Sequence, residues 1–183
     1  ELTRDSFDED GFYKIGDAGK LANADDPAQG ILFDGRVAED FKLLTGSWVS
    51  AGKIRVAAIA AGAPVIQDAV VTGHDRDEVG LLIFPSAAGS AEVAGLDPAT
   101  PLEVLVENDK VLDTLRDGLG AYNAAGRGTS ERIGRVLLMA DPPNIDANEI
   151  TDKGYINQRV VLERRGELVD RLYGDASGVL AIP

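Results

Sequence analysis

The sequence predicts an α+β fold: a small domain with a central sheet of about three strands flanked by helices, preceded by a short β-hairpin. One sequence pattern and the overall composition lead to this prediction. Short β-branched and aromatic segments alternate with longer amphipathic segments along the chain. The apolar fraction of 44% is ordinary for a globular protein with a core. With 183 residues, the chain has room for one domain, or for one domain and a piece of another.

The first unit is a set of short strands. Aromatic and β-branched residues bounded by Gly, Asn, Asp and Pro predict strands at 12–15, 19–22 and 31–33, with a polar loop at 23–30. Three short strands bury little apolar surface by themselves. We therefore expect residues 1–35 to be the last strands of a larger N-terminal domain, with residues 36–183 as the small domain.

The small domain begins with a hairpin and a helix. Residues 41–43 and 47–49 flank the turn at 44–46, which predicts two paired strands. Ser50 is expected to cap a helix from about residue 51 to residue 61, which Pro64 terminates. Two strands are predicted next, at 65–72 and 81–84, joined by a polar turn.

The second half alternates helices with one further strand. The small residues at 86–99 predict a linker, and the sequence Thr100-Pro101-Leu102-Glu103 predicts a capping box. The helix that follows carries Val111, Leu115 and Leu119 on one face and ends at the glycines of 126–128. A buried strand at 136–139, a polar loop and a last helix complete the pattern, the helix having Ile156, Val160, Leu168 and Leu172 as its apolar residues.

Composition excludes several classes of function. The net charge is −13 and no Lys/Arg run exists, so a basic nucleic-acid footprint is absent. The chain has no cysteine, which excludes disulfides and thiolate metal sites, and its single histidine, His74, argues against His-based metal clusters and a Ser-His-Asp triad. His74 and its charged neighbours 75–78 are interpreted as a solvated turn, and no metal site is predicted. No 18-residue apolar run or signal peptide is recognised, so we expect neither a membrane partner nor secretion.

Three motifs follow one another along the chain: Tyr13-Lys14-Ile15-Gly16-Asp17, then Gly35-Arg36 followed by Lys42 and Gly46, and last Glu149-Ile150-Thr151-Asp152-Lys153-Gly154-Tyr155-Ile156. In this order they resemble the adenylate-forming enzymes, a superfamily of AMP-dependent synthetases and ligases. The wording of the last two is similar to that of feruloyl-CoA synthase-like acyl-CoA ligases. The phosphate-binding loop and acyl pocket of this family lie upstream of these motifs. The chain begins at Glu1 without an initiator Met, and we expect a C-terminal fragment of a longer enzyme.

The resemblance implies roles for two charged residues. Lys153 is the expected catalytic residue, whose ammonium would contact the acyl carboxylate and the α-phosphate as charge develops on their oxygens. Asp17 is expected to bind nucleotide, because its two carboxylate oxygens suit the two ribose hydroxyls. The alternatives remain a solvated loop lysine for Lys153 and an ordinary turn aspartate for Asp17.

Further residues are assigned to nucleotide binding, the hinge and the thiol tunnel by the same resemblance. Arg36 is expected either to reach the nucleotide or to make an interdomain salt bridge. Val37, Ala38 and Glu39 are expected to contain the hinge. The turn with Gly46 and Trp48 is similar to the loop that lines the CoA tunnel, where a glycine lets a thin thiol arm pass close to the backbone. The alternative for this turn is an ordinary hairpin with Trp48 in the core or at its rim.

The expected function is that of an ATP-dependent carboxylic acid–CoA ligase in the cytoplasm. The resemblance implies ATP, AMP, Mg²⁺ and CoA as cofactors of the full-length enzyme, with none bound to this fragment, which we expect to be inactive alone. The expected partners are the N-terminal domain, a carboxylic acid such as a hydroxycinnamate, and CoA. Two alternatives stay open: an adenylation domain that serves a carrier protein, and a non-catalytic binding module.

Overall fold

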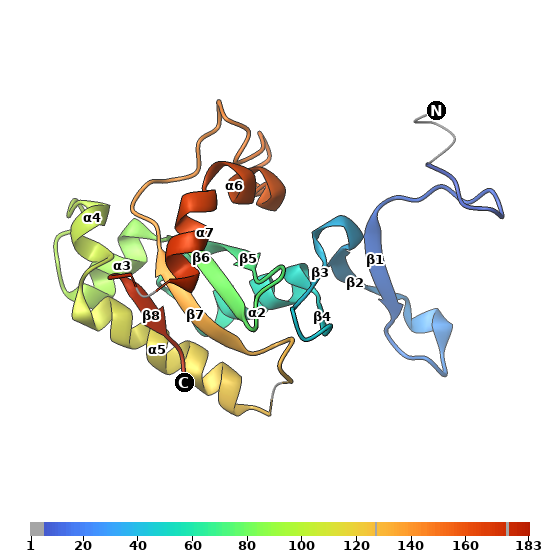
Figure 1. The fold of residues 1–183 in the computed structure, drawn as a ribbon, viewed down its shortest axis with the longest axis horizontal. Coiled ribbons are helices and arrows are strands. Elements are labelled where there is room, and N and C mark those ends of the chain that lie inside the picture. The colour runs from blue at the N-terminus through green and yellow to red at the C-terminus, as the bar shows by residue number, and fades with distance from the viewer. Residues whose placement is uncertain (1–5, 127, 175) are drawn as a thin grey trace.

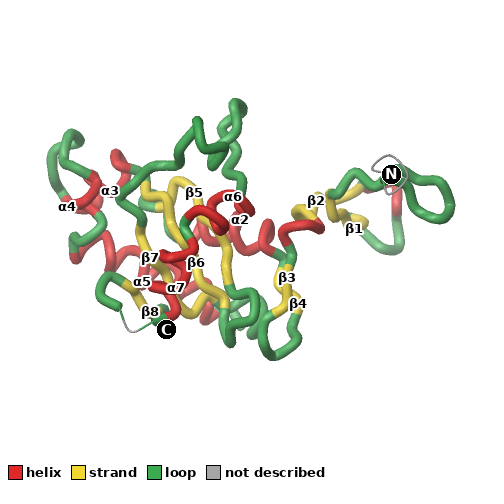
Figure 2. Tube along the Cα trace, turned by 45° about the horizontal axis from the view of Figure 1, so that its top comes forward, coloured by secondary structure: helices red, strands yellow, loops and turns green. Residues whose placement is uncertain are grey.

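The chain forms a mixed α/β body with a β-hairpin that projects from one side of it (Figure 1). The computed structural model describes residues 6–126, 128–174 and 176–183. A tube view turned by 45° shows the same arrangement, with the hairpin joined to the body near the β3–β4 hairpin and α2 (Figure 2). Residues 6–16 lead into the hairpin, and the C-terminus lies on the body.

The projecting hairpin consists of β1 (Asp17–Leu21) and β2 (Ile31–Arg36), which pair antiparallel. The loop between them holds a short 3-10 helix, η1 (Pro27–Gln29), whose N-cap Asp26 accepts a hydrogen bond from the backbone of Ala28. The strand predicted at 12–15 is wrong, since in this segment Tyr13 forms only an isolated bridge with Phe7. The two strands and their loop bury little of their own apolar surface, as expected for so few short strands.

A short junction leads from the hairpin into the body. It contains the 3-10 turn η2 (Val37–Glu39), the predicted strand pair β3 (Phe41–Lys42) and β4 (Trp48–Val49), and helix α2 (Ala51–Ala61). Ser50 stands at the N-cap of α2, but its side chain makes no cap hydrogen bond to the described helix. The carboxylate of Asp40 instead accepts from the N–H of Ala51 at 3.1 Å, which joins the junction to the start of the helix.

The body is built on a four-stranded mixed sheet in the order β5-β6-β7-β8. The outer pairs are antiparallel and the central pair, β6 with β7, is parallel. The α+β class predicted from the sequence is therefore confirmed. The fourth strand was not predicted. The bounds are β5 (Ile66–Thr72), β6 (Val79–Pro85), β7 (Ile133–Leu138) and β8 (Val179–Ala181).

Both faces of this sheet are covered, and successive residues of each strand alternate between them. Leu81 and Ile83 of β6 pack in the core beneath α2 and α5, whereas Leu82 and Phe84 pack with residues of α6 and α7. Figure 1 shows α7 lying across one face of the sheet. Helix α6 follows directly from the loop that carries Lys153, so the packing of this face also positions that loop.

The predicted linker at 86–99 is wrong over most of its length, because α3 (Ala87–Ala94) occupies it. The hydroxyl of Ser86 caps the helix by accepting from Gly89 N–H at 3.1 Å. A Cβ at Gly89 would lie 2.1 Å from the carbonyl oxygen of Pro64, so the helix approaches the backbone too closely for a larger residue. The small residues here serve close packing rather than flexibility.

Two long helices predicted from the sequence are each divided in the structure. The capping box at Thr100 is not formed: α4 (Leu102–Leu105) has Pro101 at its N-cap, and Asn108 caps the separate helix α5 (Asp109–Ala124). Part of the predicted stop at 126–128 falls on residue 127, outside the described residues. The last helix breaks at Arg165 into α6 (Gln158–Arg164) and α7 (Gly166–Tyr173).

In the described part of the chain, no helix has the length and apolarity needed to cross a membrane.

Candidate functional site

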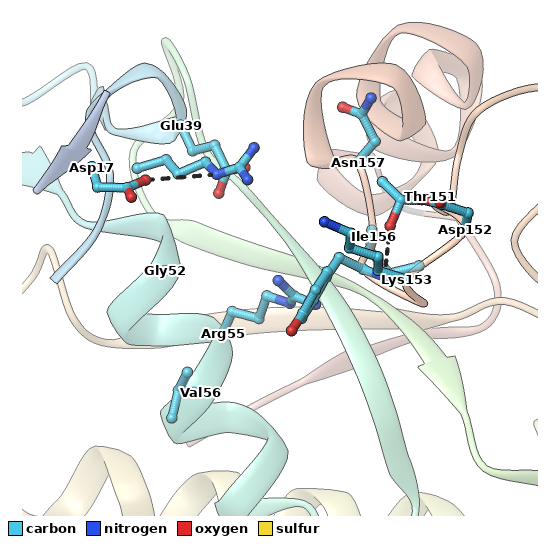
Figure 3. Close-up of a pocket in the computed structure, with 12 residues that line it drawn as sticks. Asp17, Glu39, Gly52, Arg55, Val56, Thr151, Asp152, Lys153, Ile156 and Asn157 are labelled. Atoms are coloured by element: carbon cyan, nitrogen blue, oxygen red, sulfur yellow. Dashed lines mark hydrogen bonds and ion pairs between the residues drawn. The ribbon is translucent and has the colours of Figure 1, made fainter. Parts of the chain in front are cut away.

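A cleft of about 660 Å³ opens between the hairpin, the start of α2 and the loop before α6 (Figure 3). The hairpin and junction contribute Asp17, Arg36 and Glu39, while α2 contributes Gly52, Arg55 and Val56. The rest of the lining comes from the 151–157 segment, including Lys153. Three segments far apart in the sequence, two of which carry motifs singled out above, therefore meet at one site.

The wall formed by the hairpin places two predicted nucleotide-binding residues together. Asp17 and Arg36 are register partners across β1 and β2, so antiparallel pairing sets their side chains at the same end of the hairpin. Their charged atoms, Asp17 Oδ1 and Arg36 Nε, are 4.0 Å apart, and both side chains are substantially exposed. An exposed pair at this distance contributes little to stability and leaves both groups able to contact a ligand.

The floor of the cleft contains one partly buried ion pair and one partly buried carboxylate. Arg55 donates two hydrogen bonds to Asp68 at 2.6 Å each, and these bonds raise the pKa of its guanidinium. Burial raises the pKa of Glu39, although nearby Arg36 and Arg55 act in the opposite direction. Glu39 therefore lies in the turn assigned to the hinge and also faces the cleft.

Lys153 lies at the tip of a small hairpin closed by the bridge between Ile150 and Ile156. The N–H of Thr151 donates to the carbonyl of Tyr155, and the N–H of Gly154 donates to the carbonyl of Thr151, both at 2.9 Å. Gly154 has a φ of +81°, a conformation that glycine adopts without strain. The sequence Lys-Gly thus makes a tight turn that holds the lysine in solvent at the edge of the cleft.

The cleft is electrically balanced in a strongly acidic chain. Its lining carries three carboxylates and three cationic side chains, whereas the whole chain has a net charge of −13. Arg55 is already paired with Asp68, so Arg36 and Lys153 are the lining cations best able to meet an anion. Because the chain as a whole is acidic, a phosphate needs local positive groups in order to bind, and Arg36 and Lys153 offer them in this cleft.

The predicted thiol-tunnel residues lie elsewhere. Gly46 occupies the turn between β3 and β4 with a φ of +82°, and Trp48 is 63% exposed. The ammonium of Lys42 lies 5.0 Å from the centre of the Trp48 ring, a cation–π contact on the outer surface of the hairpin. Neither Gly46 nor Trp48 lines the cleft with Lys153, so this conformation does not bring the two predicted sites together.

The described residues offer no group of three or more His, Cys, Asp or Glu side chains able to hold a metal. His74 lies in the exposed turn between β5 and β6, with its Nδ1 2.9 Å from a carboxylate oxygen of Asp75. The carboxylates of the cleft, on Asp17, Glu39 and Asp152, come from three different segments. The described part of the chain therefore shows no cluster of carboxylates that would hold a metal ion by itself.

Sequence reasoning missed a buried pair beneath the Lys153 hairpin. The side chain of Glu149 is 3% exposed and accepts from Arg165 Nε at 3.0 Å and from its terminal nitrogen at 2.7 Å. This bonding lowers the pKa of Glu149 despite its burial. The available signal was the glutamate that opens the third motif and an arginine in the interior of a predicted helix. Neither is distinctive without the fold.

The chain matches the family described as the AMP-binding enzyme C-terminal domain over residues 41–177. It is 29% identical over 180 residues to the chloroplastic long-chain-fatty-acid–acyl-carrier-protein ligase AEE15 of Arabidopsis thaliana, and 26% identical to the probable acyl-activating enzyme 16 of the same plant. These alignments take in 93% of this chain but only 22% and 24% of the two relatives.

Solved structures show the same fold. The adenylation domain of the carboxylic acid reductase from Segniliparus rugosus, in complex with AMP and a carboxylic acid, superposes with a TM-score of 0.72 at 23% identity. That superposition covers 94% of this chain and 25% of the reductase chain. The chain thus spans about a quarter of the length of the proteins it resembles. The family match, which extends over most of the body that carries Lys153, shows that this chain belongs to the AMP-binding enzyme C-terminal domain family.

Proposed function

We propose that this chain is the C-terminal lid of an ATP-dependent enzyme that activates a carboxylic acid as an acyl-adenylate and then transfers it to a thiol. One observation carries the proposal: Asp17 and Arg36, from the N-terminal hairpin, share a cleft with Lys153 from the body. Nucleotide-binding groups and a mobile cation are the chemical parts that adenylate formation needs. Residues 1–35 then belong to the larger domain, and residues 36–183 to the lid.

In the first step, a carboxylate oxygen attacks the α-phosphorus of ATP and the bond to the leaving pyrophosphate breaks. Negative charge accumulates on the phosphoryl and carboxylate oxygens in the transition state. The ammonium of Lys153, at the tip of its hairpin, stabilises that charge. Asp17 accepts hydrogen bonds from the ribose hydroxyls, and Arg36 reaches the ribose or phosphate from the same wall. When bound with ATP, Mg²⁺ would supply neutralisation of phosphate charge.

In the second step, a thiol sulfur attacks the acyl carbon and the bond to AMP breaks. A lid serves both steps if it rotates between two docked positions. The turn η2, with Val37, Ala38 and Glu39, is the short segment between hairpin and body that would absorb the rotation. The exposed Gly46–Trp48 turn would then face the thiol arm in place of Lys153.

The thiol acceptor has two candidates. Free CoA, with an aromatic acid of the hydroxycinnamate type, follows from the similarity of the Lys153 and Arg36 motifs to feruloyl-CoA synthase-like ligases. A carrier-protein phosphopantetheine is favoured by the curated relative that is 29% identical, which is a ligase for an acyl carrier protein. Measuring AMP release by the full-length enzyme with CoA or with the carrier protein separates the two, since only the true acceptor stimulates release.

The test of the proposal is Lys153→Ala in the full-length enzyme. Removing the cation should reduce adenylate formation by roughly a hundred- to a thousand-fold, measured as acid-dependent ATP–pyrophosphate exchange. Transfer from a supplied acyl-adenylate to the thiol should be unchanged. Arg159→Ala is the matched control, because Arg159 is a nearby exposed cation on α6 that does not line the cleft. Equal loss in both half-reactions, or equal loss in the control, would refute the role of Lys153.

A second measurement addresses the fragment itself. The 183-residue chain should show no acid-dependent ATP–pyrophosphate exchange, because the resemblance places the phosphate-binding loop of these enzymes in the larger domain. Clear turnover by the pure chain would contradict the proposal that this is a lid. A chain that neither turns over nor restores exchange to its separately expressed N-terminal domain would instead point to the non-catalytic binding module.

A further inference from the structure

The hairpin that carries Lys153 does not fix its own orientation. Its internal hydrogen bonds, between Thr151 and Tyr155 and between Thr151 and Gly154, shape the turn but reach no other element. The position of Lys153 at the tip therefore depends on the two sides of the hairpin, its first leg (residues 149–151) and its second leg (residues 155–157). The second leg is held by the start of α6, where Asn157 caps the helix and Gln158 accepts from the N–H of Val71 on β5 at 3.0 Å. The first leg depends on Glu149.

Glu149 is anchored from three directions. Arg165 binds its carboxylate with two hydrogen bonds, and the N–H of Asn144 donates to Oε2 at 2.8 Å. A second cation, Arg164, lies 3.6 Å from Oε1. The backbone carbonyl of Glu149 also accepts from the N–H of Asn157 at 2.9 Å, across the base of the Lys153 hairpin. One buried residue thus holds both legs of the hairpin together.

Arg165 connects this anchor to the rest of the body. Besides Glu149, its guanidinium donates to the carbonyls of Asp141 at 3.0 Å and Pro142 at 2.9 Å, and it contacts the sulfur of Met139. All five N–H donors of the side chain are therefore used. The guanidinium also lies 5.0 Å from the centre of the Phe84 ring on β6. Both ends of the 141–149 loop are fastened to the sheet through this one group.

We propose that Glu149 and Arg165 are positioning residues for Lys153, an inference that rests on the proposed function. Bidentate pairing between a guanidinium and a carboxylate fixes geometry as well as binding strength. The pair sets the direction of the first leg, so it sets where the ammonium of Lys153 arrives when the lid closes on a nucleotide. A displacement of about 1 Å at a reacting group costs on the order of a hundred-fold in rate. Neither residue of the pair lines the cleft that contains Lys153.

The body offers a matched control for this pair. Glu78 and Arg135 form a second ion pair, with 2.6 Å between Oε1 and Nε, on the same sheet. Arg135 also donates to a backbone carbonyl, that of Leu172, and lies over an aromatic ring, that of Tyr173. Glu78→Gln therefore weakens an ion pair of the same chemical type, more exposed than Glu149–Arg165, without touching the Lys153 hairpin.

The first experiment measures hydrogen exchange in the 183-residue chain. Glu149→Gln should accelerate exchange of the amides of Thr151, Gly154 and Asn157 by at least about ten-fold, since local opening becomes easier once the anchor is weakened. Glu78→Gln should leave these amides unchanged. Arg165→Lys, which keeps the charge but loses the planar fork, serves as a second variant if Glu149→Gln does not fold. Unchanged exchange at these amides in a folded variant overturns the proposal.

The second experiment links the anchor to Lys153 in the full-length enzyme. Glu149→Gln should reduce adenylate formation about ten- to a hundred-fold and leave thiol transfer from a supplied adenylate intact. Added to Lys153→Ala, it should cause no further loss, because the anchor acts only through the lysine. A further loss in the double variant, or equal loss in both half-reactions, overturns the positioning role. If Lys153→Ala itself leaves adenylation intact while exchange still rises, the proposed function fails and the anchor of the hairpin stands.

Discussion

The projecting hairpin and the body use their apolar residues in opposite ways. In the body, the central strand β6 is buried along its whole length, and Leu81, Leu82 and Ile83 are fully inaccessible. In the hairpin and its N-terminal arm, Ile15 and Ile31 are more than 70% exposed. The body therefore contains a core of its own, whereas the hairpin presents apolar side chains without covering them.

This difference shows how the candidate site is divided. Asp17 and Arg36 stand on the part that lacks a core, and Lys153 stands on the part that has one. We propose that the hairpin belongs to the larger domain of the enzyme, whose surface covers its apolar side chains. The nucleotide-binding groups and the lysine would then move relative to each other when the junction at Val37–Glu39 bends.

The largest effect should come from the core of the body. Leu82→Ala removes a fully buried side chain between β6 and the helices α6 and α7. We expect a loss of about 2–5 kcal/mol in the free energy of unfolding, because the cavity left behind cannot fully collapse. Denaturant unfolding followed by circular dichroism measures the loss. A loss below about 1 kcal/mol would contradict the comparison, since it would mean that the body lacks a tightly packed core.

A smaller effect should follow from titration of Glu149. Hydrogen bonding to Arg165 lowers the pKa of this carboxyl in the folded chain, so the folded state binds fewer protons than the unfolded state. The stabilisation is present above the ordinary carboxyl pKa and is lost as the pH falls through the folded value. A hydrogen bond to a charged group contributes roughly 1.5–3 kcal/mol. Unfolding free energies measured from pH 7 to pH 3 should fall less steeply for Glu149→Gln than for the wild type, and parallel curves would exclude this anchor.

The smallest effect should come from the hairpin. Ile31→Ser changes a residue that is 74% exposed, so the 183-residue chain should change in stability by less than about 0.5 kcal/mol. In the full-length enzyme, where we propose that this side chain is covered, the same substitution should cost about 1.5–3 kcal/mol. Val104→Ser on the body, also exposed, is the control and should be neutral in both proteins. Equal effects of Ile31→Ser in the short and long proteins would remove the reason for assigning the hairpin to another domain.

The sequence predicted the elements whose patterns are local and missed those decided by packing. Helix α2 and strands β5, β6 and β7 follow from apolar periodicity and turn residues, and all are found. Strand β8 has three residues and is recognisable only from its pairing with β7. Helix α3 resembled a linker because Gly89 and its small neighbours are needed for contact with Pro64, a reason visible only in three dimensions.

The candidate site divides in the same way. Lys153, Asp17 and Arg36 stand in motifs with a fixed order, and the structure places all three in one cleft. The presence of Arg55 in the lining of the cleft could not be predicted, because it depends on the angle at which α2 meets the hairpin. Arg165 was hidden inside an amphipathic pattern that predicted one continuous helix. The break between α6 and α7 occurs at this residue, which turns to bind Glu149.

The side chain of Gln158 has a consequence for the outer edge of the sheet. Strand β5 is an edge strand, and an exposed row of amides there can recruit a strand from another molecule. The carboxamide oxygen of Gln158 occupies one of those donors, the N–H of Val71, from the first turn of α6. The same helical turn that ends the lysine hairpin therefore blocks the pairing of another strand at this position of the sheet edge.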